Sequence, residues 1–284
     1  MTNGRETWSG STHALCAVRR SLCLTTMALS AACASAGKGG NRTPRGASVD
    51  VGVGIGVATA ANTATEQLLT RAIAYAGGDA ALSRARALTW DGEAIVHAGG
   101  RTVPIAGRWA IQPPDSAIVA TYAVANGPTT MRSLIVAAPR GWTESKGAFT
   151  PLPATMLANE RDEFYLYSVM RLVTLRAPGV TLVAVARDSS GNEGLGVRQT
   201  GRPDVDLFIG KDGRVVRLVT IVADASTGKP AREELAFEGS LSASGIRWPH
   251  ILRITLEGAP YFDLTMRNLR VYPRLDEPLL RGPK

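Results

Sequence analysis

Few residues of this chain have the chemistry of nucleophiles, acid–base groups or metal ligands. All three cysteines lie within the first 33 residues, so the rest of the chain contains no disulfide and no thiolate site. Beyond His13, only His97 and His250 occur, and they lack the close helical spacing of a metal-binding pair. No Gly-x-Ser-x-Gly nucleophile elbow is present. The sequence predicts no catalytic residue, no cofactor and no metal site.

Two groups of carboxylates remain as candidates. Asp204 and Asp206 follow Pro203 at the start of an expected strand, where they could hold a cation but are more typical of a turn. A second group, formed by Glu160, Asp162 and Glu163, falls in the early part of an expected helix, where acidic residues complement the helix dipole. We therefore interpret both groups as structural.

The first 36 residues have the pattern of a bacterial export signal. Two arginines precede an apolar run over 21–36, which is shorter than the about 20 residues needed to span a bilayer and ends in small residues. Cleavage after 34–36 by ordinary signal peptidase is one reading. The other is a lipobox that ends at Cys33, although Ser30 stands where an aliphatic residue is usual. We expect a periplasmic protein or, if Cys33 is lipidated, one anchored to the outer membrane.

Composition divides the remainder of the chain. Residues 37–62 are small and polar with few large apolar groups, which predicts a flexible linker, and residues 63–284 form the expected folded domain. The net charge is +8, half of it within residues 1–63, and the other charges are interspersed without a basic run. Nucleic-acid binding is therefore not predicted.

Hydrophobic periodicity predicts a mainly β (α+β) fold. Helices are expected over 65–76 and 80–87, and an inserted helix over 153–176 whose second half is apolar on more than one side. The remaining segments alternate with period two and are separated by short turn signals. These expected strands are 88–96, 102–111, 116–124, 130–137, 141–143, 180–187, 194–200, 205–209, 215–223, 233–238, 248–257 and 261–272.

Short hairpin connections require antiparallel pairing. A long meander of this kind curls, because curling limits exposed strand edges. We expect a single curved antiparallel sheet or half-open β-barrel, with an N-terminal helix and an inserted lid-like helix.

Local motifs within this pattern resemble a known family. The helix that ends in Gly77-Gly78, the segment from Gly107 through Trp109 to Pro113, and the late run from Tyr261 to Pro273 are similar to LolA-like, outer-membrane lipoprotein-sorting proteins. The resemblance implies an open β-barrel with an apolar cavity that holds acyl chains beneath a helical lid. In carriers of that family an arginine precedes the proline of the second strand, whereas Gln112 stands there in this chain.

Three functions follow as alternatives. The first is a non-catalytic binding protein of the cell envelope that holds a lipid, acylated peptide or other hydrophobic ligand. The second is an envelope protein–protein interaction or sensor module, and the third is a hydrolase that uses His97 or His250. A large apolar void beneath residues 164–173 would favour the first. Its expected cavity residues are Trp90, Trp109, Tyr122, Leu134, Phe164, Met170 and Val173.

Overall fold

The computed structural model describes residues 54–224 and 228–283, with side chains from residue 63 onward. Cys33, the expected export signal and residues 37–53 of the expected linker lie outside these residues. Within the described part, no helix is both long enough and apolar enough to cross a membrane.

Thirteen strands form one antiparallel sheet, and two short strands form a separate hairpin. Most strands coincide with the predicted ones to within a few residues, because alternation and turn residues mark them. The sheet strands are β1 (Ala87–Ala98), β2 (Arg101–Gln112), β3 (Ser116–Ala123), β4 (Arg132–Ala137), β5 (Arg140–Ser145), β6 (Ala148–Pro151), β7 (Val180–Val185), β8 (Glu193–Gln199), β9 (Val205–Ile209), β10 (Val215–Ala223), β11 (Pro230–Glu238), β14 (Ile251–Leu256) and β15 (Ala259–Tyr272). The hairpin strands are β12 (Leu241–Ala243) and β13 (Ile246–Trp248).

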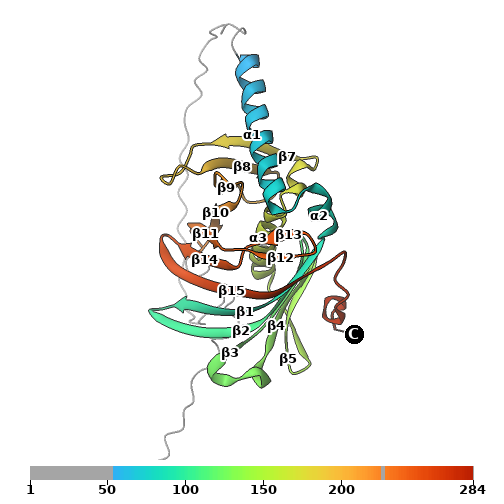
Figure 1. Cartoon of the computed structure of the whole chain (residues 1–284). Coiled ribbons are helices and arrows are strands. Elements are labelled where there is room, and N and C mark those ends of the chain that lie inside the picture. Colours follow the sequence, from blue (N-terminus) through green and yellow to red (C-terminus); the bar gives the residue numbers. More distant parts are fainter. Residues whose placement is uncertain (1–53, 225–227, 284) are drawn as a thin grey trace, which may run out of the picture.

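Strand order explains the position of the inserted helix. The order is β6-β5-β4-β3-β2-β1-β15-β14-β11-β10-β9-β8-β7, so the strands before and after α3 (Ala154–Met170) are the two opposite edges of the sheet. A chain that leaves one edge and re-enters at the other must cross a face of the sheet. The helix α3 makes this crossing inside the curve of the sheet (Figure 1). The predicted fold, a single curved antiparallel sheet that does not close, is confirmed.

The other helices differ from prediction in their lengths. The first helix, α1, spans Gly54–Ala76 and begins well before the predicted residue 65, so it includes residues 54–62 of the predicted linker. Alanine has a high helix propensity, but residues 54–62 carry no hydrophobic stripe. Hydrophobic periodicity therefore does not reveal this part of the helix. The second, α2, spans Asp79–Arg84. The inserted helix ends at Met170, and a separate 3₁₀ turn, η3 (Val173–Arg176), follows it.

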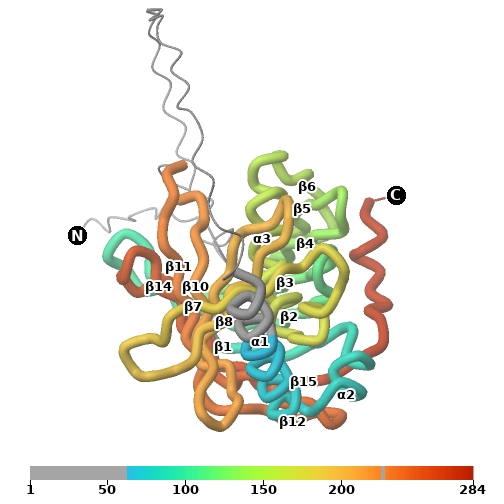
Figure 2. Tube along the Cα trace, turned by 90° about the horizontal axis from the view of Figure 1, so that it is seen from above, coloured from blue at the N-terminus to red at the C-terminus, as the bar shows by residue number. Residues whose placement is uncertain are grey.

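Three further 3₁₀ turns lie in connections and near the C-terminus. They are η1 (Val124–Asn126), η2 (Pro128–Thr130) and η4 (Pro278–Arg281). Seen from above, α1 and α3 lie between the two halves of the curved sheet, and the C-terminal segment runs along its outside (Figure 2).

Buried side chains form two cores, one on each face of the sheet. The large core lies on the concave face and includes residues of α1, α2 and α3 together with inward-facing strand residues such as Trp109, Leu235 and Leu264. The small core lies on the convex face around Ile118 and Trp142, where the C-terminal segment covers it. The concave face is therefore the one that can enclose a ligand.

Candidate ligand-binding site

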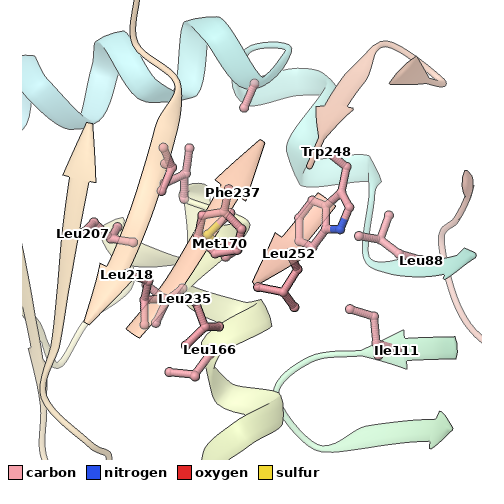
Figure 3. Close-up of a cluster of buried hydrophobic side chains, with 14 of the residues drawn as sticks. Leu88, Ile111, Leu166, Met170, Leu207, Leu218, Leu235, Phe237, Trp248 and Leu252 are labelled. Carbon is pink, nitrogen blue, oxygen red and sulfur yellow. The ribbon is translucent and has the colours of Figure 1, made fainter. Parts of the chain in front are cut away.

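A cavity lies between α3 and the concave face of the sheet, and we call it the central cavity. From α3 it is lined by Glu160, Glu163, Phe164, Leu166, Tyr167 and Met170. From the strands and their connections it is lined by Trp109, Val119, Leu134, Leu235, Phe237, Trp248, Pro249, Leu252, Ile254, Phe262 and Met266. In the close-up, Leu166 and Met170 of α3 lie against Leu235 and Phe237 of β11 (Figure 3).

Strand alternation places these side chains on one face. On β11 the buried residues Leu235 and Phe237 face the cavity, and on β14 Leu252 and Ile254 do the same. Successive side chains of a strand point to opposite faces, so a strand with period-two burial presents an apolar wall to α3. Carboxylates enter the lining only from α3.

Two tryptophans on neighbouring strands pack beneath α3, and one of them reaches the cavity. Trp90 and Trp109 are direct partners across β1 and β2, and each is almost fully buried. Gly92 leaves room for the indole of Trp109, because a Cβ there would stand 2.7 Å from a ring carbon. Tyr167 of α3 packs over Trp90 with ring centroids 5.8 Å apart. Trp90 therefore lies behind Tyr167 and does not line the cavity.

The structure brings together part of the set of residues expected from the sequence. Trp109, Leu134, Phe164 and Met170 all line the central cavity. Tyr122 does not, because it shares the strand parity of Ile118, which belongs to the convex core.

Val173 also lies outside the cavity, because the helix ends at Met170 and Val173 belongs to the following 3₁₀ turn. It packs against the large core, partly buried.

Sequence reasoning missed the half of the cavity that comes from the C-terminal strands. Leu235, Phe237, Leu252 and Phe262 lie on strands whose alternation is visible in the sequence. The missing information was the pairing of β15 with β1, which brings these late strands beside the early ones. Such a long-range pairing leaves no local signal.

The central cavity is apolar, as expected, but small. Its volume is about 50 Å³. Pockets that enclose small-molecule ligands commonly measure about 300–1,000 Å³. The side chains of α3 occupy most of the space between the helix and the sheet, which is why the cavity is small.

The helix α3 is held in the described chain by side-chain contacts rather than by main-chain hydrogen bonds to the sheet. In the described chain, no main-chain hydrogen bond joins residues 154–170 to a strand of the sheet. Pro153 precedes the helix without a side-chain cap. At the other end Leu172 has φ 57° and ψ −48°, and the Val173 N–H donates to the Arg171 carbonyl at 2.5 Å. This is a classic γ-turn, a rare and strained conformation for a residue with a side chain.

The apolar surroundings shift the pKa values of two groups on α3. Burial raises the pKa of Asp162, although Arg202 and Arg161 act in the opposite direction. Burial also raises the pKa of Tyr165. Glu160 is 4% exposed and has a polar partner in the structure. For Asp162 and Tyr165 the apolar surroundings thus disfavour the charged form.

The other candidate groups of the sequence lie elsewhere. The Nε2 of His97 is 2.9 Å from Oδ2 of Asp263, but His97 shares the outward-facing parity of exposed Ile95, and no histidine lines the central cavity. Arg198 pairs with both Asp204 and Asp206, at 3.2 and 2.8 Å. This ion pair accounts for the two aspartates without a cation.

Gln112, the residue that departs from the family pattern, contacts the C-terminal segment. Its Oε1 accepts a hydrogen bond from the main-chain N–H of Leu275 at 2.9 Å. It therefore holds the C-terminal segment and makes no contact of this kind with α3.

No family model matches the chain, and no curated protein matches it. Among solved structures, it is similar to a LolA superfamily protein from Nitrosomonas europaea, with 10% identity and a TM-score of 0.49 over 78% of this chain and 97% of that one. It is also similar to a protein domain from Vibrio parahaemolyticus described as outer membrane lipoprotein-sorting, with 12% identity and a TM-score of 0.48 over 75% and 94% of the two chains.

A third similar structure is a DUF1329 family protein from Desulfovibrio piger, with 10% identity and a TM-score of 0.49 over 74% of this chain and 92% of that one. Similarities of this strength assign no ligand and no residue role. The LolA-like group that the sequence resembles is among the solved structures to which this chain is similar.

Proposed function

We propose that this protein is an exported, non-catalytic binding protein that holds a hydrophobic ligand or acyl chain between α3 and the concave face of its sheet. The central cavity carries the proposal, because its strand walls are apolar and it lies inside the curve of the sheet. Burial of a ligand there gains about 0.8 kcal/mol per methylene group removed from water. Lipidation at Cys33 would place such a protein on a membrane, and cleavage after residues 34–36 would leave it free in the periplasm.

Binding requires α3 to move, since the closed cavity is too small for an acyl chain. The helix is held by side-chain packing, and its C-terminal end is a strained γ-turn at Leu172. A ligand chain would replace the contacts of Leu166, Tyr167 and Met170 with the strands. The apolar surface that opening exposes would then be covered by the ligand.

A protein-interaction module is the alternative, and the small cavity favours it. A filled interior is what such a module would have. Among the described residues, the large apolar side chains that are exposed are Ile95, Val124, Met131 and Ile221. The first three lie on or beside the neighbouring strands β1 to β4, and Ile221 lies on β10. The apolar lining of the central cavity nevertheless gives the ligand-binding reading the more specific support.

A pair of tryptophan variants tests the proposal. Leu134→Trp places an indole in the central cavity, whereas Ile95→Trp adds the same group to an outward-facing position that is 40% exposed. Binding would be followed with the neutral fluorescent probe N-phenyl-1-naphthylamine on the purified chain. We expect the parent and Ile95→Trp to bind the probe, and Leu134→Trp to lose at least about tenfold in affinity through steric filling.

Hydrogen exchange supplies the second measurement. Bound probe should change the exchange rates of the main-chain amides of residues 154–170. The amides of strand residues whose side chains form the convex face should change less. If the parent binds neither the probe nor any lipid extracted from an envelope fraction, the binding function is wrong. In that case, recovery of a single crosslinked protein partner in intact cells would favour the interaction module.

A further inference from the structure

Two further crevices adjoin opposite ends of α3, and they differ in the charge of the residues that line them. The first, which we call the basic crevice, lies at the C-terminal end of α3 and shares Met170, Phe237 and Trp248 with the central cavity. Arg214 and Arg247 line it, and no acidic residue does.

The second, the acidic crevice, lies along the first half of α3. It shares Glu160 and Glu163 with the central cavity, and Asp162 also lines it. Among the described residues no arginine or lysine lines it, although Arg161 and Arg202 lie near Asp162. The crevice at one end of the central cavity is thus lined by carboxylates and the crevice at the other by arginines.

Both arginines of the basic crevice have guanidinium N–H groups that a ligand could use as hydrogen-bond donors. Arg247 Nη1 donates to the Tyr75 carbonyl at 3.0 Å, and its guanidinium lies 5.1 Å from the centre of the Tyr75 ring. Among the described residues, no carboxylate forms an ion pair with Arg247. Arg214 lies 3.9 Å from the Asp212 carboxylate, which is longer than a hydrogen bond, and its buried Nε has no hydrogen-bond partner in the described structure.

Asp212 itself is engaged elsewhere. Its Oδ1 accepts the main-chain N–H of Arg214 at 3.0 Å, within the turn that joins β9 and β10. The guanidinium groups at the crevice are therefore not neutralised by tight pairing. A guanidinium presents several donors in one plane and matches the oxygens of a phosphate or a carboxylate.

We infer that the ligand is an anionic amphiphile, bound with its phosphate or carboxylate head at Arg214 and Arg247 and its apolar chain in the central cavity. This inference rests on the proposed function and specifies its ligand class. The arginines lie at one end and the carboxylates at the other, so an anionic head is expected at the arginine end and the bound chain has one direction. The head remains at the crevice mouth, where Arg247 is exposed.

The unpaired indole N–H of Trp248 does not enter this inference. Its Nε1 is buried without a hydrogen-bond partner in the described structure, but it points toward Leu88 rather than toward Met170 and Phe237 (Figure 3). It is a buried donor of the core.

Three single-chain lipids with the same oleoyl chain test the head-group preference. Lysophosphatidic acid is anionic, lysophosphatidylcholine is zwitterionic and monoolein is neutral. Each would displace N-phenyl-1-naphthylamine from the full chain below its critical micelle concentration. We expect lysophosphatidic acid to bind at least about tenfold more tightly than monoolein, because charge-assisted hydrogen bonds form only with the anionic head. Oleate separates a carboxylate preference from a phosphate preference.

Arginine variants locate the head. Arg247→Gln should bring the affinity for lysophosphatidic acid toward that for monoolein while leaving the affinity for monoolein unchanged, and Arg247→Lys should restore part of it. Arg214→Gln should act in the same direction. The matched control is Arg253→Gln, which removes an exposed charge from the convex face and should change neither affinity.

The outcomes separate this inference from the proposed function. Equal affinities for lysophosphatidic acid and monoolein, or no effect of either arginine variant, would overturn the anionic head and leave a neutral ligand in the cavity. Binding of inorganic phosphate as tight as that of lysophosphatidic acid would contradict an amphiphile. If no lipid binds at all, both the proposed function and the inference fail.

Discussion

The concave and convex faces of the sheet are built from alternate residues of the same strands, yet their chemistry is opposite. On β11, Leu235 and Phe237 face α3, whereas Glu234 and Glu238 face outward and pair with arginines. On β14, Leu252 faces inward and Arg253 pairs with Glu238. On these strands the convex face pairs its polar groups across neighbouring strands, and the concave face buries its apolar groups under the helices, with α3 over the central cavity.

This difference shows where a ligand can compete. A ligand on the convex face would have to displace ion pairs that already satisfy the side chains. On the concave face it would replace only apolar contacts with α3. The dispersion attraction and burial of the ligand's own apolar groups compensate for those contacts equally well. The following substitutions test how sharply the two faces differ.

The largest effect is expected for a substitution on the inner face of β11. Phe237→Ala should lower the free energy of unfolding by about 3–5 kcal/mol, because it removes a buried ring and leaves a cavity beside Met170. Its neighbour Glu238→Ala changes the outer face and should cost about 0–1 kcal/mol, since its ion pair with Arg253 is exposed. Urea unfolding of both variants measures the contrast, and equal losses would contradict it.

An intermediate effect is expected where the convex face is partly buried. Arg217 bonds to Asp188 at 3.0 Å and to Glu234 at 3.1 Å, and it lies 4.1 Å from the centre of the Phe208 ring. Arg217→Gln should lower the free energy of unfolding by about 1–2 kcal/mol. This value lies between those of an exposed ion pair and of a buried hydrogen bond to a charged group. Thermal unfolding at two salt concentrations measures it. A loss as large as that of Phe237→Ala would remove the distinction between the faces.

The sequence predicted the strands and the architecture well, because each strand carries its own alternation and its own turns. The hairpin from 205–209 to 215–223 is an example, and both strands agree with the structure. Helix limits were harder. Residues 54–62 show little apolar periodicity, and the break after Met170 comes from the backbone conformation of Leu172 rather than from a proline or a glycine.

The candidate site was predicted only in part, for a topological reason. Trp109 and Leu134 lie on early strands next to the inserted helix, so a local argument found them. Phe237 and Leu252 reach the same cavity through the pairing of β1 with β15, which single-sequence patterns do not specify. Tyr122 was placed wrongly because a parity error of one residue moves a side chain to the other face.

The shifted pKa values of Asp162 and Asp188 predict opposite pH dependences of stability. Burial raises the pKa of Asp162 on α3 above its ordinary value of 3.8, so the ionised form costs stability above the folded pKa. Asp162→Asn should therefore be more stable than the parent at neutral pH. As the pH falls through the raised pKa toward 3.8, the parent takes up its proton and the difference should vanish. Urea unfolding between neutral and acid pH checks this, and a variant less stable at neutral pH would contradict it.

Asp188 should behave with the opposite sign. A hydrogen bond from the Asn192 side-chain amide, with further donors from the main-chain N–H groups of Asn192 and Ser190 and from Arg217, lowers the pKa of Asp188 below 3.8. The stability this gives is present above 3.8 and is lost as the pH falls through the folded pKa. Asp188→Asn should thus be less stable than the parent at neutral pH, and the two should converge in acid.

The smallest effect is expected at the most exposed convex pair. Arg267 and Glu93 lie 3.1 Å apart across β15 and β1, and both side chains are more than half exposed. A double-mutant cycle with Arg267→Gln and Glu93→Gln should give a coupling of about 0.2–1 kcal/mol that decreases as salt is added. A larger, salt-insensitive coupling would mean that the convex pairs are shielded from water.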